Sequence, residues 1–190
     1  LSEENKQNHG NDSVQILFLG NLCERKGVWD LIQAMQNVEG AVLNFVGGEE
    51  DAGIFDKVEQ QLVAKGLTNK IKLLGPQFGD AKIEFLRQSD IFVLPSYAEG
   101  LPISLLEAMS YALPVIVTPV GGIPIAISDQ QEGIIVNVGE VVELVDALNV
   151  LIADGQLGKK MGLAARKRCE QQFGVEVTVK KLSTIYSRLF

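Results

Sequence analysis

The sequence predicts an α/β fold: a doubly wound parallel sheet of about six strands, followed by a C-terminal cluster of helices. Short aliphatic runs recur along the chain, and each is nearly continuous in apolar residues, as is typical of parallel strands covered on both faces. Helical patterns separate these runs, and such alternation implies right-handed βαβ units. The last third of the chain contains helical patterns only, which accounts for the terminal cluster.

The six expected strands share β-branched and aliphatic composition. They are residues 16–19, 42–46, 71–74, 91–94, 115–118 and 134–136.

Two amphipathic helices are predicted between the first three strands. Trp29, Leu31, Ile32 and Met35 form one apolar stripe, and we interpret Trp29 as a core residue because it shares this spacing. Phe55, Val58 and Leu62 form the second stripe, and Lys65-Gly66 is typical of the end of that helix.

Three consecutive helices are predicted at the end of the chain, over residues 140–153, 156–172 and 175–188. Gly155 and Gly174 mark the breaks between them. We expect this cluster to pack against one edge of the sheet or to reach a neighbouring domain.

Length and composition predict one domain. The chain has 190 residues, 46% of them hydrophobic, which is enough for one full core over residues 14–190. Residues 1–13 are polar and aperiodic and are expected to be a disordered linker. Because the chain begins at Leu1 in such a linker, we expect it to be part of a larger protein.

Charge and residue usage exclude several classes of function. A net charge of −7 argues against general binding of nucleic acid or of anionic membranes. The only histidine, His9, lies in the linker, so no histidine-based triad or metal site is expected, and no metal cofactor is predicted. Cys23 and Cys169 are far apart and are interpreted as reduced thiols of a cytoplasmic protein. No apolar run is long enough for a transmembrane segment.

The most informative segment is residues 95–109, which follows the fourth predicted strand. Glu99 lies in a turn and Glu107 in the next helix, whose first residue is predicted to be Pro102. The free amides of Gly100, Leu101 and Ile103 would form a nest for phosphate oxygens at the helix start.

Carboxylates beside such a nest would accept hydrogen bonds from the hydroxyl groups of a ribose or a sugar, so the segment predicts a nucleotide-sugar site. In the alternative interpretation, Glu99 and Glu107 only complement the helix dipole on a solvated face.

A second candidate segment is the turn after the first strand, residues 20–27. Arg25 and Lys26 precede a helix, where positive charge opposes the dipole, so we expect an anionic partner rather than a merely solvated helix start. The turn matches neither the dinucleotide-binding glycine fingerprint nor the Walker A motif, which argues against a dehydrogenase or an ATP site.

These segments together resemble the retaining GT-B-fold glycosyltransferases of family 4 (group 1). The resemblance covers nearly the whole chain from about Val14. Its motifs, in order, are Gly20-Asn21-Leu22, Lys26-Gly27, residues 92–96, the E-x7-E pair Glu99 and Glu107, residues 113–116, Gly121-Gly122 and residues 132–136.

The resemblance implies a Rossmann-like domain, the C-terminal donor-binding half of a GT-B fold. It implies that Glu107 accepts hydrogen bonds from the ribose hydroxyls and that Glu99 holds the transferred sugar as the catalytic carboxylate. The amides after Glu99 would bind the diphosphate. The donor-binding set is Gly20, Asn21, Arg25, Lys26, Glu99, Gly100, Leu101, Pro102, Ile103 and Glu107.

The resemblance also implies the reaction and its partners. Transfer from a nucleotide-sugar to an acceptor hydroxyl would proceed by same-face displacement assisted by the leaving diphosphate, without a protein nucleophile, in polysaccharide or glycoconjugate synthesis. The sugar or lipid-linked acceptor would be held by an N-terminal domain absent from this chain, so we expect weak donor binding and no turnover by this chain alone. That absent half would also carry any peripheral membrane association.

Two positions depart from the family pattern. Asn21 stands where the family usually has Arg, which leaves Lys26 as the matched diphosphate cation. Ile125 stands where Glu is common, and the preceding Gly121-Gly122 allows a close backbone approach either to ligand or to neighbouring structure. These departures support the competing hypothesis of a non-catalytic nucleotide-binding or interaction module with the same fold.

Overall fold

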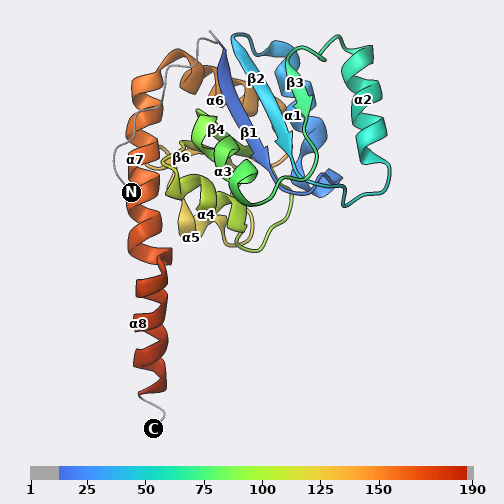
Figure 1. Cartoon of the computed structure of the whole chain (residues 1–190). Coiled ribbons are helices and arrows are strands. Elements are labelled where there is room, and N and C mark those ends of the chain that lie inside the picture. Colours follow the sequence, from blue (N-terminus) through green and yellow to red (C-terminus); the bar gives the residue numbers. More distant parts are fainter. Residues whose placement is uncertain (1–12, 188–190) are drawn as a thin grey trace.

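Six parallel strands form a single sheet in the order β3-β2-β1-β4-β5-β6 in a computed structural model of the chain, which describes residues 13–187 (Figure 1). The predicted α/β fold and its six strands are confirmed. The strands are β1 (Val14–Leu19), β2 (Ala41–Val46), β3 (Ile71–Leu73), β4 (Ile91–Leu94), β5 (Val115–Val117) and β6 (Gly133–Ile135).

The strand order reverses between β1 and β4, which lie side by side although β2 and β3 intervene in the sequence. Ile16 pairs with Ile91 and Leu17 with Phe92. After β1 the chain moves toward the β3 edge of the sheet, and after β4 it moves toward the β6 edge. The two connections therefore run toward opposite edges of the sheet, and open α/β sheets bind ligands at the carboxyl ends of such strands.

Helices cover both faces of the sheet (Figure 1). One layer brings α1 against α6, and the other brings α4 against α7. The α-helices are α1 (Val28–Ala34), α2 (Ile54–Ala64), α3 (Gly79–Gln88), α4 (Ile103–Ser110), α5 (Ile123–Ala126), α6 (Val141–Ala153), α7 (Gly155–Phe173) and α8 (Val175–Tyr186), and two 3-10 turns, η1 (Glu24–Lys26) and η2 (Met35–Asn37), flank α1.

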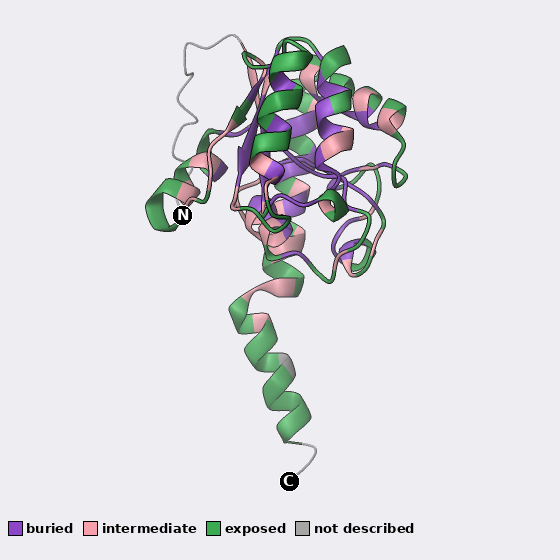
Figure 2. Cartoon of the chain, turned by 90° about the vertical axis from the view of Figure 1, so that its right-hand side faces the viewer, coloured by how far each residue is buried: buried purple, intermediate pink, exposed green. Residues whose placement is uncertain are grey.

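The core lies on both sides of the sheet, as the continuous apolar runs predict. Consecutive residues Ile16, Leu17 and Phe18 are all fully buried although their side chains point to opposite faces. Phe18 and Phe45 meet edge to face across β1 and β2, with ring centroids 5.1 Å apart. Figure 2 shows the buried residues gathered in the sheet and on the inner sides of the helices.

The three terminal helices form where the sequence predicts them, but they behave differently. The Asp154 side chain accepts hydrogen bonds from the amides of Gln156 and Leu157, so α7 begins at Gly155 rather than after it. Helices α6 and α7 contribute to the core, whereas α8 extends away from the body of the molecule (Figures 1 and 2). Its apolar side chains, including Val179 and Leu182, are exposed.

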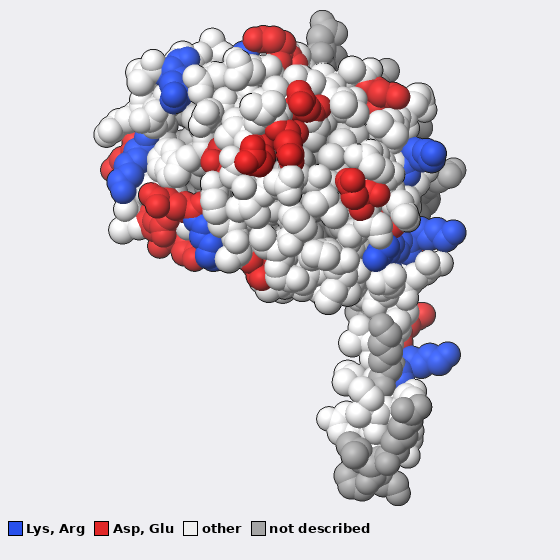
Figure 3. All heavy atoms as spheres, turned by 180° about the vertical axis from the view of Figure 1, so that it is seen from behind, with Lys and Arg blue, Asp and Glu red and all other residues white. Residues whose placement is uncertain are grey.

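Most of the predicted linker, residues 1–12 with His9, lies outside the described residues. Within residues 13–187 no helix is both long and apolar enough to cross a membrane. Figure 3 shows the back of the molecule, where acidic side chains are spread over the body and basic ones lie toward its edges.

Candidate functional site

The loops after β1 and β4 are joined at the point where the strand order reverses. The Tyr97 amide donates a hydrogen bond to the Arg25 carbonyl over 2.8 Å, and Arg25 Nη1 donates to the Ala98 carbonyl over 2.9 Å. Gly27, at φ +70°, makes this approach possible, because a Cβ there would lie 2.3 Å from the Pro95 carbonyl oxygen. The two segments singled out in the sequence therefore form one site.

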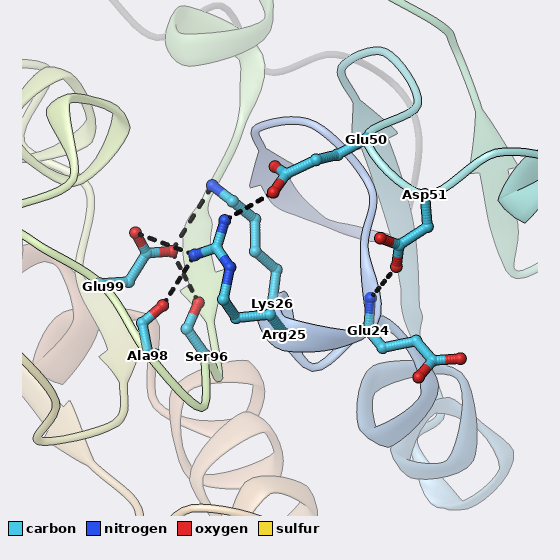
Figure 4. Close-up of polar contacts among 8 residues, drawn as sticks. All are labelled: Glu24, Arg25, Lys26, Glu50, Asp51, Ser96, Ala98 and Glu99. Atoms are coloured by element: carbon cyan, nitrogen blue, oxygen red, sulfur yellow. Dashed lines mark hydrogen bonds and ion pairs between the residues drawn. The ribbon is translucent and has the colours of Figure 1, made fainter.

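Glu99 is enclosed at the centre of this site (Figure 4). Its side chain is 9% exposed, and its Oε1 lies 3.5 Å from Lys26 Nζ. Ser96 Oγ donates a hydrogen bond to the same oxygen over 2.9 Å, and Arg25 Nη1 lies 4.0 Å from Oε2. This burial is not that of a carboxylate on a solvated face, so the alternative interpretation is wrong for Glu99.

Arg25 has a second carboxylate partner on the loop after β2 (Figure 4). Arg25 Nη2 donates to Glu50 Oε1 over 2.8 Å, and this hydrogen bond raises the pKa of Arg25 and lowers the pKa of Glu50. The anionic partner expected for Arg25 and Lys26 is thus present inside the chain, as Glu50 and Glu99. A phosphate bound here would share these two cations with protein carboxylates.

The start of α4 presents unused backbone donors, as predicted. The backbone amides of Gly100, Leu101 and Ile103 donate a hydrogen bond to no acceptor among the described residues. Pro102 is extended, with ψ 126°, so it caps the helix from outside and α4 begins one residue later than predicted. The three amides keep the positive end of the helix behind them, which favours an anion at this position.

Gly121-Gly122 approaches neighbouring structure rather than leaving space for a ligand. A Cβ on Gly121, at φ +56°, would lie 1.8 Å from the Glu99 carbonyl oxygen. The Gly122 amide donates to the Gly100 carbonyl over 2.6 Å. This contact supports the loop that carries Glu99 and the free amides.

Arg168 of α7 braces the chain just beyond that glycine pair. It donates to the Ile125 carbonyl over 3.0 Å and forms an ion pair of 3.3 Å with Glu132, whose side chain is 7% exposed. The Ile125 side chain itself is 66% exposed.

Glu107 lies farther along α4 and pairs with Lys82 of α3. Lys82 Nζ donates to Glu107 Oε1 over 2.6 Å, and both side chains are about one-third exposed. Among the described residues, no donor engages Glu107 Oε2. That oxygen can accept a hydroxyl group while Lys82 holds the carboxylate in place.

Asn21 connects the loop after β1 to the loop after β2. Its Oδ1 accepts the Gly48 amide over 3.2 Å. Gly20 leaves room for Lys26, because a Cβ at Gly20 would lie 2.9 Å from Lys26 Nζ. Gly20 and Asn21 therefore shape the site, and the cations there are Arg25 and Lys26.

Sequence reasoning missed several residues at this edge. Ser96 lies within the recognised motif and was not assigned a role, while Glu50 and Lys82 belong to no motif and meet the site only through the tertiary fold. Trp29, interpreted as core, packs against the core but is only partly buried, and it lines a cavity with Tyr97. Within the described part of the chain, no three acidic, cysteine or histidine side chains gather as metal ligands.

The chain has a doubly wound α/β sheet, and its paired cations and free amides lie at the edge where the strand order reverses, the edge at which sheets of this class bind ligands. Comparison with known proteins identifies the family. The family model for glycosyl transferases group 1 matches residues 2–168, and the chain belongs to this family. Its fold is that of the Rossmann-like C-terminal domain of a GT-B glycosyltransferase.

Individual relatives agree with this assignment. The chain is 33% identical over 186 residues to N-acetyl-alpha-D-glucosaminyl L-malate synthase of Bacillus anthracis, covering 95% of this chain and 48% of that protein. The chain thus spans about half the length of this curated relative.

Two solved structures show the same fold. The C-terminal domain of a glycosyl transferase group 1 family protein from Francisella tularensis has a TM-score of 0.74 and 24% identity, covering 85% of this chain and 87% of that one. HepE of Anabaena in complex with UDP-glucose has a TM-score of 0.83 and 23% identity, covering 93% and 49%.

Proposed function

We propose that this chain is the donor-binding half of a retaining glycosyltransferase. It would hold a nucleotide-sugar at the carboxyl ends of β1 and β4 for transfer of the sugar to an acceptor hydroxyl. The observation that carries the proposal is the convergence of Lys26, Glu99 and the free amides at the start of α4 on one edge of the sheet.

Each part of this edge fits one part of such a donor. The free amides of Gly100, Leu101 and Ile103 would donate to diphosphate oxygens, with Lys26 and Arg25 neutralising charge. Glu107 Oε2 would accept from the ribose hydroxyls, and Glu99 would hold the hydroxyls of the transferred sugar. Two solved relatives, HepE with UDP-glucose among them, were crystallised with uridine nucleotides, and this supports a nucleotide-sugar as ligand.

The reaction would use the leaving diphosphate as its own base. The cations and amides at the α4 end would stabilise the negative charge that develops on the diphosphate as the glycosidic bond breaks. The acceptor hydroxyl would attack on the same face and pass its proton to a diphosphate oxygen, so the anomeric configuration would be retained without a protein nucleophile or a metal. We further propose that a second domain holds the acceptor, because relatives in the family are about twice as long as this chain.

Donor binding is tested by thermal shift and calorimetry of the 190-residue chain with UDP-, GDP- and ADP-glucose. We expect one of them to raise the melting temperature, because a ligand that binds only the folded state stabilises it in proportion to ln(1 + [L]/Kd). Lys26→Ala and Glu107→Ala should reduce this shift. The matched controls are Lys57→Ala and Glu59→Ala, both exposed on α2, which should leave it unchanged.

Two outcomes would overturn parts of the proposal. Unchanged donor binding in Glu107→Ala would remove the ribose assignment. Sugar transfer by the purified chain to a simple glycoside acceptor would show that no second domain is needed. In any preparation that transfers, an inverted anomeric configuration in the product, read by NMR, would contradict retention.

A further inference from the structure

A cavity lies beside the candidate donor site. It has a volume of about 340 Å³ and is lined by Glu24, Arg25, Gly27, Trp29, Asp30 and Tyr97. Its residues come from η1, the start of α1 and the loop after β4, so it borders the loop that carries Glu99. None of the roles proposed for the donor uses Trp29, Asp30 or Tyr97.

Two aromatic side chains form the apolar part of the cavity. Trp29 is partly buried against the core, and Tyr97 is 47% exposed. The Tyr97 amide donates to the Arg25 carbonyl, and the Tyr97 hydroxyl lies beside Gly139, where a Cβ would lie only 3.2 Å from it. The cavity therefore has two aromatic side chains in its walls.

Asp30 supplies a carboxylate to the wall of the same cavity. Its Oδ2 is buried and receives no hydrogen bond from the described residues. The neighbouring carboxylate also raises the pKa of Tyr97, chiefly by accepting the hydrogen bond of its hydroxyl group. Because Asp30 lines the cavity, a ligand hydroxyl at this wall would donate a hydrogen bond to its carboxylate.

The charges around the cavity restrict the ligand. Glu24 and Asp30 are both acidic and would repel a phosphate or a carboxylate. Arg25, the one cation among the lining residues, is already engaged by Glu50 and the Ala98 carbonyl, and its positive charge opposes a cationic ligand. A neutral molecule with hydroxyl donors and an apolar C–H face fits this combination, since hydroxyls suit carboxylates and the C–H face packs on aromatic rings.

We propose that this cavity binds a neutral sugar ring, at a site separate from that of the nucleotide-sugar donor. The ring packs against Trp29 and Tyr97, and one of its hydroxyl groups donates to the Asp30 carboxylate. This binding does not depend on donor binding at Glu99. The volume of the cavity accommodates one monosaccharide unit and leaves its neighbour in a longer glycan outside.

Trp29 is the only tryptophan of the chain, so its fluorescence reports this cavity directly. The 190-residue chain is titrated with the methyl α-glycosides of glucose, galactose and mannose, up to about 50 mM, and each binding constant is repeated by calorimetry. We expect a saturable change in tryptophan emission with at least one glycoside, with a Kd in the millimolar range.

Substitutions then test the two recognition elements. Asp30→Asn keeps the shape of the side chain and removes its charge, and it should weaken glycoside binding about tenfold. Tyr97→Ala removes an exposed ring and should weaken binding by a similar factor without unfolding the chain. Tyr186→Ala on α8 is the matched control, because this tyrosine is 61% exposed and is not among the cavity's lining residues.

Three outcomes would overturn the proposal. They are the absence of a saturable signal with all three glycosides, a signal that Asp30→Asn and Tyr97→Ala both leave unchanged, and a response to choline in place of the glycosides. The donor proposal fails separately: a chain that binds no nucleotide-sugar but still gives the glycoside signal would support this cavity alone. Lys26→Ala should lose nucleotide-sugar binding and keep the glycoside signal.

Discussion

Lys26 Nζ lies 3.5 Å from Glu99 Oε1, and this pair joins the loop after β1 to the loop after β4 with both side chains largely buried. The Ser96 hydroxyl donates to the same oxygen, so Glu99 is held by a cation and a neutral donor together. A carboxylate held in this way keeps one orientation. The pair links the stability of the fold to the geometry of the candidate donor site.

Lys26→Met should destabilise the chain by about 2 kcal/mol, because it leaves Glu99 with less compensation in a buried setting. Lys70→Met is the matched control. Its partner Glu39 is closer, at 2.7 Å, but is 82% exposed, so the loss should stay at or below about 1 kcal/mol. Urea unfolding of both variants measures the difference, and equal losses would show that burial does not strengthen the Lys26–Glu99 pair.

Gly121→Ala should destabilise the chain by about 3 kcal/mol and weaken donor binding, because its Cβ would collide with the Glu99 carbonyl in addition to the cost of a positive φ. Gly53→Ala separates the two effects. Gly53 has φ +72° but open space around its Cβ position, so only about 1 kcal/mol should be lost. If the two variants lose equal stability in urea, the close approach at Gly121 carries no cost.

Arg168→Met should cost about 2–3 kcal/mol, because Glu132 is buried and would lose its cation. Arg166→Met on the same helix removes an exposed i,i+4 pair with Glu170 and should change the stability by no more than about 0.5 kcal/mol. Thermal unfolding compares the two variants. A donor titration of Arg168→Met shows whether the contacts of Arg168 with the segment after Gly122 also affect donor binding. We expect weaker donor binding in this variant.

Cys23 should react slowly with a disulfide reagent at neutral pH. Burial raises the pKa of this thiol, and the negative charge of Glu50 raises it further, so little of the reactive thiolate is present until the pH exceeds the ordinary range for cysteine. On a Cys169→Ser background, the labelling rate against pH should have its midpoint above that of the unfolded chain.

Glu50→Gln is the companion variant for this titration. Removal of the Glu50 charge should move the Cys23 midpoint to lower pH without bringing it to the unfolded value, because burial is the larger cause. If the folded chain is labelled as fast as the unfolded chain at neutral pH, the raised pKa of Cys23 is contradicted.

The sequence predicted most of the fold because its signals are local. Continuous aliphatic runs such as residues 16–19 and 91–94 mark strands buried on both faces, and glycine at position 66, with φ +66°, ends α2 where expected. The first residue of α7, which Asp154 caps, and the first residue of α4, which follows the extended Pro102, each differ from the prediction by one position. Such shifts depend on side-chain hydrogen bonds and on ψ angles, which composition and spacing do not specify.

The candidate site was predicted in part for the same reason. Glu99, Glu107 and the amides between them are close in the sequence, and one turn and one helix place them, so the sequence alone determined this half of the site. The partners of the two carboxylates come from elsewhere: Lys26 lies 73 residues before Glu99, and Lys82 lies on a different helix from Glu107.

The tertiary structure alone decided which charges meet. The reversal of strand order between β1 and β4 places the loops after these strands beside each other, and this contact encloses Glu99 and leaves Trp29 and Tyr97 lining a common cavity. Arg25 in turn meets Glu50 of the loop after the neighbouring strand β2. Burial and pairing depend on contacts between distant segments, whereas a sequence pattern records only neighbours along the chain. The sequence determined the sheet, the helix start and the carboxylate pair; packing decided that Glu99 is buried and Asp30 Oδ2 unsatisfied.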